Sequence, residues 1–113
     1  MACLFCQIIK REIPAEIVFE DDDLLAFEDI APQAPTHLLV IPKRHVATLN
    51  DLEESDRALV GRLPIVAARL ARERGFAEEG YRVVMNCNDD GGQTVYHVHM
   101  HLMGGRRFTW PAG

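Results

Sequence analysis

The stretch His97-Val98-His99-Met100-His101-Leu102-Met103 alternates imidazole and apolar side chains. Successive side chains of a β-strand point to opposite faces, so on a strand His97, His99 and His101 share one face and the apolar residues share the other. On a helix the same spacing would scatter the imidazoles around the axis. We therefore predict a strand over residues 93–103 that presents three histidines on an exposed face of a sheet.

Three interpretations of this histidine face can be weighed. The imidazoles can be ordinary surface residues of an edge strand, or two of them can bind zinc from one face. They can also supply a nucleophile and its helpers, because a neutral imidazole attacks an electrophile at pH 7 without first losing a proton. We favour covalent catalysis by His99, which is central and has another histidine on either side.

The rest of the chain reads as one domain, residues 1–113, of the α+β class. Residues 37–41 form an apolar run typical of a strand buried on both faces. Ser55 is placed to cap the start of a long helix that ends at Gly75. Pro64 inside this helix predicts a kink or a local break in the helical hydrogen bonds. The pattern predicts a five-stranded antiparallel sheet with one long and one short helix. The other predicted strands are residues 16–20, 24–28 and 81–86, the short helix is 4–10, and a turn spans 88–92.

The amino-acid composition argues against several classes of protein. The net charge of −5 argues against nonspecific binding to nucleic acid, although it is compatible with a local site for a small anion. No run approaches the ~20 apolar residues of a membrane helix, and the first residues lack a secretory signal, so we expect a cytoplasmic protein. Three cysteines are too few, and odd in number, for a disulfide framework.

With the residues around it, the histidine stretch resembles the histidine triad family. The resemblance covers nearly the whole chain and is strongest to the branch of nucleotide-binding proteins that are purine nucleoside phosphoramidases. The segments that carry it include Ile13-Pro14-Ala15, residues 27–45, Gly92-Gln93-Thr94-Val95-Tyr96 and Trp110-Pro111.

The resemblance implies a two-step hydrolysis. His99 would attack the α-phosphorus of a nucleoside phosphoramidate, the amine would leave, and water would release the nucleoside monophosphate from a nucleotidyl-histidine. Charge builds on the phosphoryl oxygens, so a nearby donor lowers the barrier. His101 is the expected donor, with His97 and His37 in support. From the residues alone, His37 could equally be a sheet histidine with satisfied hydrogen bonds.

The resemblance also implies a set of substrate contacts. Asp29 would accept hydrogen bonds from the ribose hydroxyls. Taken alone, Asp29 also fits a loop cap, and the apolar residues also fit an ordinary core. The implied purine wall comprises Leu4, Phe5, Ile8, Phe27 and Ile30, the sugar-phosphate contact is Asn86, and the phosphate or leaving-group contacts are Gln93 and Thr94.

Cys3 and Cys6 form a C-x-x-C pair at the start of the chain. Such a pair can be a redox couple, half of a zinc site, or neither. His45 and His97 are available as further ligands, and the resemblance to bacterial and archaeal relatives implies a structural zinc on these four residues. A His97 bound to zinc could not also shuttle a proton. We expect no organic cofactor.

The resemblance implies a homodimer in which two five-stranded sheets join, with Trp110 reaching toward the partner's site. The alternatives to the phosphoramidase are a dinucleoside polyphosphate hydrolase and a nucleotide-binding adaptor that acts through protein partners.

Overall fold

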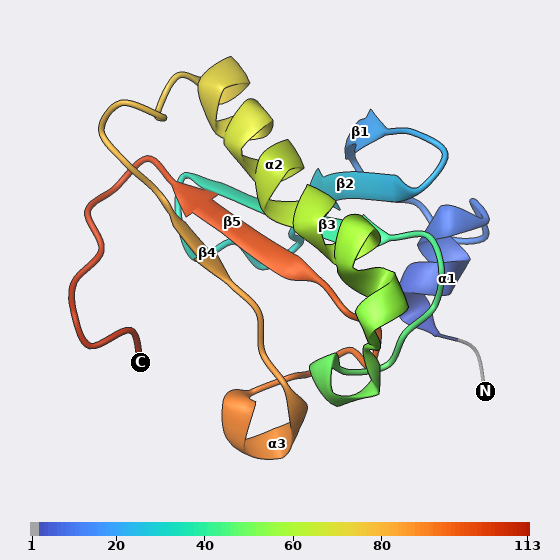
Figure 1. Ribbon diagram of the computed structural model, residues 1–113. Coiled ribbons are helices and arrows are strands. Elements are labelled where there is room, and N and C mark those ends of the chain that lie inside the picture. The colour runs from blue at the N-terminus through green and yellow to red at the C-terminus, as the bar shows by residue number, and fades with distance from the viewer. Residues whose placement is uncertain (1–2) are drawn as a thin grey trace.

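The long helix α2 lies across one face of a five-stranded antiparallel sheet (Figure 1). The structure is a computed structural model that describes residues 3–113. The strands lie in the order β1-β2-β3-β5-β4, so the expected α+β fold is confirmed. The helices and strands are α1 (Leu4–Ile9), β1 (Ile17–Glu20), β2 (Leu24–Glu28), β3 (Thr36–Pro42), α2 (Arg57–Arg74), β4 (Arg82–Val84), α3 (Asn88–Gly91) and β5 (Met100–Gly104).

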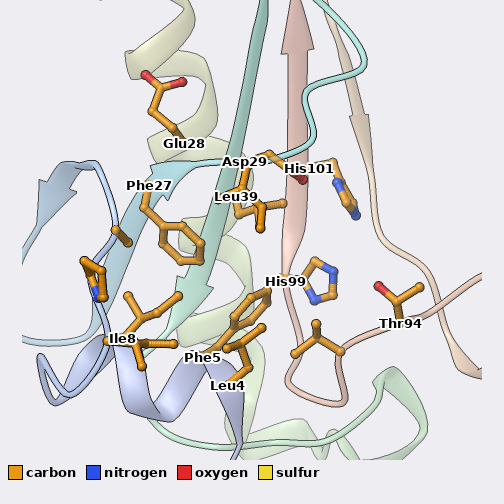
Figure 2. A pocket seen from close by; sticks show the side chains of 15 residues that line it. Leu4, Phe5, Ile8, Phe27, Glu28, Asp29, Leu39, Thr94, His99 and His101 are labelled. Atoms are coloured by element: carbon orange, nitrogen blue, oxygen red, sulfur yellow. The ribbon is translucent and has the colours of Figure 1, made fainter.

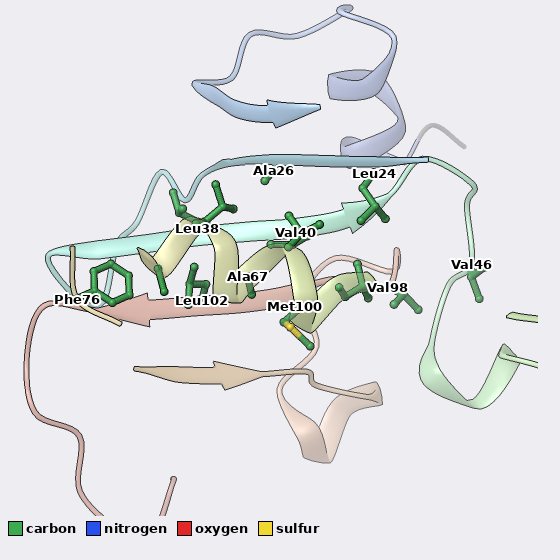
Figure 3. Packing of buried hydrophobic residues seen from close by; sticks show 14 residues of the cluster. Leu24, Ala26, Leu38, Val40, Val46, Ala67, Phe76, Val98, Met100 and Leu102 are labelled. Atoms are coloured by element: carbon green, nitrogen blue, oxygen red, sulfur yellow. The ribbon is translucent and has the colours of Figure 1, made fainter. Parts of the chain in front are cut away.

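Two hydrophobic clusters occupy the two faces of the sheet. Alternate residues of β2 and β3 point to each side, which explains why Leu38 and Val40 face α2 while Leu39 and Ile41 face α1. The cluster under α2 includes Val98, Met100 and Leu102 (Figure 3). The cluster on the opposite face contains Phe5, Ile8 and Phe27. The central strands are therefore buried on both faces, as the apolar run of β3 predicts.

The last strand is shorter than predicted. β5 begins at Met100, where it pairs with Val40 of β3, and not at residue 93. His97 and His99 lie in the segment before β5. A 2.7 Å hydrogen bond from the Val98 N–H to the Val46 carbonyl holds this segment against the loop that follows β3. The alternation of faces still holds. The histidine face is not exposed as expected, however, because α1 covers it and leaves His97 0% and His99 6% exposed.

The long helix begins and ends for local reasons. A short 3₁₀ turn (Glu54–Asp56) precedes it, and the Asp56 carboxylate accepts a hydrogen bond from the Glu53 N–H at 2.8 Å. The predicted Ser55 cap is therefore wrong, and α2 starts at Arg57. Gly75 ends the helix with a positive φ of 84°, which glycine adopts without strain.

Pro64 does not interrupt α2. It lies on the solvent side of the helix, where water can bond the carbonyl that its missing N–H leaves free. Elsewhere, β4 is shorter than the predicted 81–86, and the predicted turn at 88–92 is the single helical turn α3, ended by Gly92. Among residues 3–113, none of the helices combines the length and the apolar character needed to cross a lipid bilayer.

Candidate active site

A pocket of about 310 Å³ opens on the α1 face of the sheet (Figure 2). Its apolar side is built by α1 and β2, and His99 and His101 lie at its other side. The residues predicted to bind substrate that line it are Leu4, Phe5, Ile8, Phe27, Asp29, Ile30 and Thr94. A volume of this size is at the lower end of the range of small-molecule sites.

The ring of His99 has a fixed orientation. Its Nδ1 lies 2.7 Å from the main-chain carbonyl oxygen of His97. A carbonyl oxygen can only accept, so Nδ1 carries the proton and donates it. The Phe5 ring packs edge-on at 5.1 Å between ring centres. In the neutral ring, Nε2 therefore keeps its lone pair, which is the state that a nucleophilic imidazole requires.

His101 and His37 form a second, directional pair. The Gln33 N–H donates to Nδ1 of His37 at 3.0 Å, and Nε2 of His37 lies 2.9 Å from Nδ1 of His101. Since His37 Nδ1 accepts, its ring proton sits on Nε2 and is donated to His101. The proton of neutral His101 consequently sits on its own Nε2, which makes that atom a hydrogen-bond donor.

Both rings of this pair are held neutral near pH 7. Burial, together with the neighbouring His99 and His37, lowers the pKa of His101 to about 4. Burial also lowers the pKa of His37, partly opposed by Asp29, whose Oδ2 lies 3.4 Å from His37 Nε2. The other carboxylate oxygen of Asp29 accepts from the Ala31 N–H at 2.8 Å. Asp29 is thus held at the rim of the pocket beside the histidine pair.

His97 faces away from the pocket into a cluster with Cys3, Cys6 and His45. Its Nε2 donates to the Pro42 carbonyl oxygen at 2.7 Å, which leaves Nδ1 without a proton. That Nδ1 lies 3.4 Å from Cys3 Sγ, 3.6 Å from Cys6 Sγ and 3.2 Å from His45 Nδ1. Around a tetrahedral zinc the ligand atoms lie about 3.3–3.8 Å apart, given metal–ligand bonds of about 2.0–2.3 Å. The donor set and its spacing therefore fit zinc.

Three predicted substrate contacts lie outside the pocket lining. Gln93 is buried and its amide bonds to the main chain: Nε2 donates to the carbonyls of Ala47 and Val95, and Oε1 accepts from the Asn88 N–H. Asn86 is half-buried beyond the end of β4. Trp110 is 84% exposed, and its predicted contact concerns a partner subunit.

The structure adds pocket residues that the sequence reasoning did not single out as substrate contacts. Leu39 lines the pocket because it alternates with Leu38 along β3, and Val95 follows Thr94 into the wall. The turn Ile13-Pro14-Ala15, which contributes to the resemblance, also lines it. The period-two pattern of β3 is the signal that could have identified Leu39.

Comparison with known proteins places this site in a family. A family model, that of the HIT domain, matches residues 10–108. The chain belongs to the HIT family. The resemblance to the histidine triad family seen in the sequence is therefore confirmed.

Named relatives of this HIT chain cover most of its length. A purine nucleoside phosphoramidase from Escherichia coli strain K12 is 53% identical over 103 residues, which are 91% of this chain and 87% of the relative. An uncharacterised HIT-like protein from Synechococcus elongatus is also 53% identical, over 97% of this chain and 96% of its own. The crystal structure of a HIT family hydrolase from Legionella pneumophila matches with a TM-score of 0.97 and 57% identity, covering 99% of this chain and 100% of the other.

Proposed function

We propose that this HIT protein cleaves the P–N bond of purine nucleoside phosphoramidates through a covalent intermediate on His99. That the chain is a HIT family hydrolase rests on the family match and on the 53% identity to a purine nucleoside phosphoramidase. One observation carries the finer proposal: the Nδ1–H of His99 is bound to the His97 carbonyl, which leaves Nε2 as the nucleophile.

In the first step, the Nε2 lone pair of His99 bonds to the α-phosphorus and the P–N bond breaks. The amine takes the electron pair of that bond and a proton from solvent. The nucleotidyl-imidazole is cationic, and its Nδ1–H is already directed at the His97 carbonyl oxygen, 2.7 Å away. The Nε2–H of His101 donates to a phosphoryl oxygen as negative charge builds there. By analogy with oxyanion holes, one such donor contributes about 10²–10³ in rate.

In the second step, water attacks the phosphorus and the bond to His99 breaks. The imidazole takes the electron pair of the P–N bond. One proton of the water goes to solvent and the other stays on the new P–OH group, so the products are the nucleoside monophosphate and neutral His99. Because the proton stays on Nδ1 of His99 through both steps, the enzyme returns to its starting tautomer without rotating the ring.

The pocket supports a nucleoside as the bound group. The purine would pack between the side chains of α1 and those of β2, where Phe5 and Phe27 meet edge-to-face with ring centres 5.3 Å apart. The Asp29 carboxylate would accept from the ribose hydroxyls while the Ala31 N–H holds it in place. Thr94, beside His99 on the pocket wall, would contact the phosphate or the leaving group.

The same proposal includes a structural zinc on Cys3, Cys6, His45 and His97. When bound, this ion would supply a tie between the start of the chain and the segment that carries His99. His97 would then act through its carbonyl oxygen and as a ligand, and not as a proton carrier. The homodimer, with Trp110 near the partner's site, stays a prediction.

The test is a rate comparison on purified protein. Adenosine 5′-phosphoramidate should be hydrolysed faster than diadenosine polyphosphates, and acid quenching should trap a nucleotidyl adduct on a histidine peptide. His99→Ala should lower kcat by more than about 10³-fold and leave the Kd for AMP within a few-fold of wild type.

Equal turnover by wild type and His99→Ala would reject the mechanism. Faster cleavage of diadenosine polyphosphates would assign the chain to dinucleoside polyphosphate hydrolysis. Tight AMP binding without turnover of any of these substrates would favour a nucleotide-binding adaptor.

A further inference from the structure

The turn that follows β5 holds the loop between β2 and β3. Arg106 donates from both Nε and Nη2 to the carbonyl oxygen of Gln33, each at 3.1 Å. Gly105, with a positive φ of 93°, lies so close to Pro35 that an added Cβ would be 2.8 Å from the proline Cβ. The C-terminal turn and this loop therefore pack as one unit.

The guanidinium of Arg106 is itself held in place. It stacks on the Phe108 ring at 4.1 Å, and Arg82 of β4 lies 5.2 Å from the centre of the same ring. Arg82 also donates to the Thr109 carbonyl oxygen at 2.8 Å. A planar guanidinium that is stacked and directs two converging N–H groups at one carbonyl oxygen restricts that oxygen's position more than a single flexible donor would.

Arg106, stacked on Phe108 and bonded to the Gln33 carbonyl, forms a clamp on the loop between β2 and β3. Gln33 connects this clamp to the active site. Its carbonyl accepts from Arg106, and its N–H donates to Nδ1 of His37, which in turn donates from Nε2 to His101. Each of these bonds has a direction fixed by chemistry, because an amide N–H can only donate. The order of donors runs from Gln33 through His37 to His101 and ends at the Nε2–H of His101.

Resting on the phosphoryl-transfer function proposed above, we propose that Arg106 is a positioning residue. By holding Gln33, it keeps the amide N–H on His37 and so fixes the tautomer in which His101 presents an N–H to the phosphoryl group. Arg106 does this without contact to the pocket, whose lining does not include it.

The alternative state shows why the clamp affects rate. If His37 carried its proton on Nδ1, its Nε2 would accept from a proton on Nδ1 of His101. One proton moves on each ring, so the pair stays neutral, but Nε2 of His101 then presents a lone pair to the phosphoryl oxygens. Asp29, 3.4 Å from His37 Nε2, still favours the productive tautomer. Loss of Arg106 should therefore weaken the bias without abolishing it.

The experiment compares Arg106→Ala with Arg107→Ala, a neighbouring exposed arginine whose side chain makes no hydrogen bond in the described structure. We expect Arg106→Ala to lower kcat for adenosine 5′-phosphoramidate about tenfold, a fraction of the 10²–10³ that a whole donor contributes. KM and the Kd for AMP should change less than twofold. Arg106→Lys, which retains one donor, should recover part of kcat, and Arg107→Ala should match wild type.

Long-range ¹H–¹⁵N NMR of the imidazoles gives a readout that a merely structural role would not change. In wild type the two ring nitrogens of His101 should show the separate shifts of a single tautomer protonated on Nε2. In Arg106→Ala they should move toward each other as the two tautomers mix. Wild-type ring shifts in Arg106→Ala would overturn the proposal, whatever happens to kcat.

The proposal and the enzymatic function can fail separately. If wild type cleaves no phosphoramidate, the proposed function fails and the NMR comparison still decides whether Arg106 controls the tautomer. If Arg106→Ala does not fold, Arg106→Lys and Arg106→Gln replace it. Their loss of kcat must then follow their loss of the single-tautomer signal, and a loss of kcat with unchanged ring shifts overturns the inference.

Discussion

Replacing His101 with glutamine should make the protein's stability less dependent on pH. The pKa of His101 is lowered to about 4 in the folded protein from an ordinary value of 6.5. Protonation therefore favours the unfolded chain. The stability that the neutral ring provides is fully present above pH 6.5 and is lost as the pH falls toward 4.

The size of the effect follows from the two pKa values. Between pH 7 and pH 5, a shift from 6.5 to 4 would remove about 2 kcal/mol from the free energy of unfolding. His101 is only partly buried, so solvent screening reduces the effect, and we expect about 1 kcal/mol. The carboxylates of Glu20 and Asp21 have lowered pKa values and titrate below this window. Burial also lowers the pKa of His37, so wild type should lose somewhat more than His101 alone provides.

The assay is urea unfolding of wild type and His101→Gln at pH 7 and pH 5, at one protein concentration and with zinc present. Glutamine keeps a donor and an acceptor but does not titrate. The variant should lose about 1 kcal/mol less than wild type between the two pH values. Zinc release at pH 5 affects both proteins and cancels in the difference. Equal losses, or an NMR titration that places the His101 pKa near 6.5, would refute the argument.

Two further changes test the metal cluster and the packing of β5. Wild type should contain one zinc per chain by elemental analysis. The double variant Cys3→Ser with Cys6→Ser should contain none, because the remaining two imidazoles cannot complete a tetrahedral site. A wild-type protein that is as stable without zinc as with it would contradict this. Gly104→Ala should destabilise the protein by about 1–3 kcal/mol, since the new Cβ would lie 2.3 Å from the Phe76 ring. Gly61→Ala, in α2 with nothing within 4 Å of its Cβ, should instead stabilise by about 0.5–1 kcal/mol. Equal thermal shifts for the two alanine variants would show that the contact with Phe76 is not limiting.

The sequence determined the parts of this protein that depend on neighbours along the chain. The alternation of residues 97–103 placed the imidazoles on one face and Val98, Met100 and Leu102 on the other, although the paired strand begins only at Met100. The period-two rule survives because an extended backbone alternates its side chains with or without a hydrogen-bonded partner strand. A residue belongs to a β-sheet only where a neighbouring strand pairs with it. Residue 93 has no such partner strand in the described structure, so β5 does not extend back to it.

Only the tertiary structure decided which ring nitrogen of His37, His97 and His101 carries the proton. For His97 the partner is the carbonyl of Pro42, which is distant in sequence. For His37 it is the nearby amide of Gln33, which is itself held by the distant Arg106. A hydrogen bond has a direction set by both partners, so the chemistry of an imidazole cannot be read from the histidine alone. Residue types and local spacing thus named the reactive groups, while long-range packing assigned each of them a role.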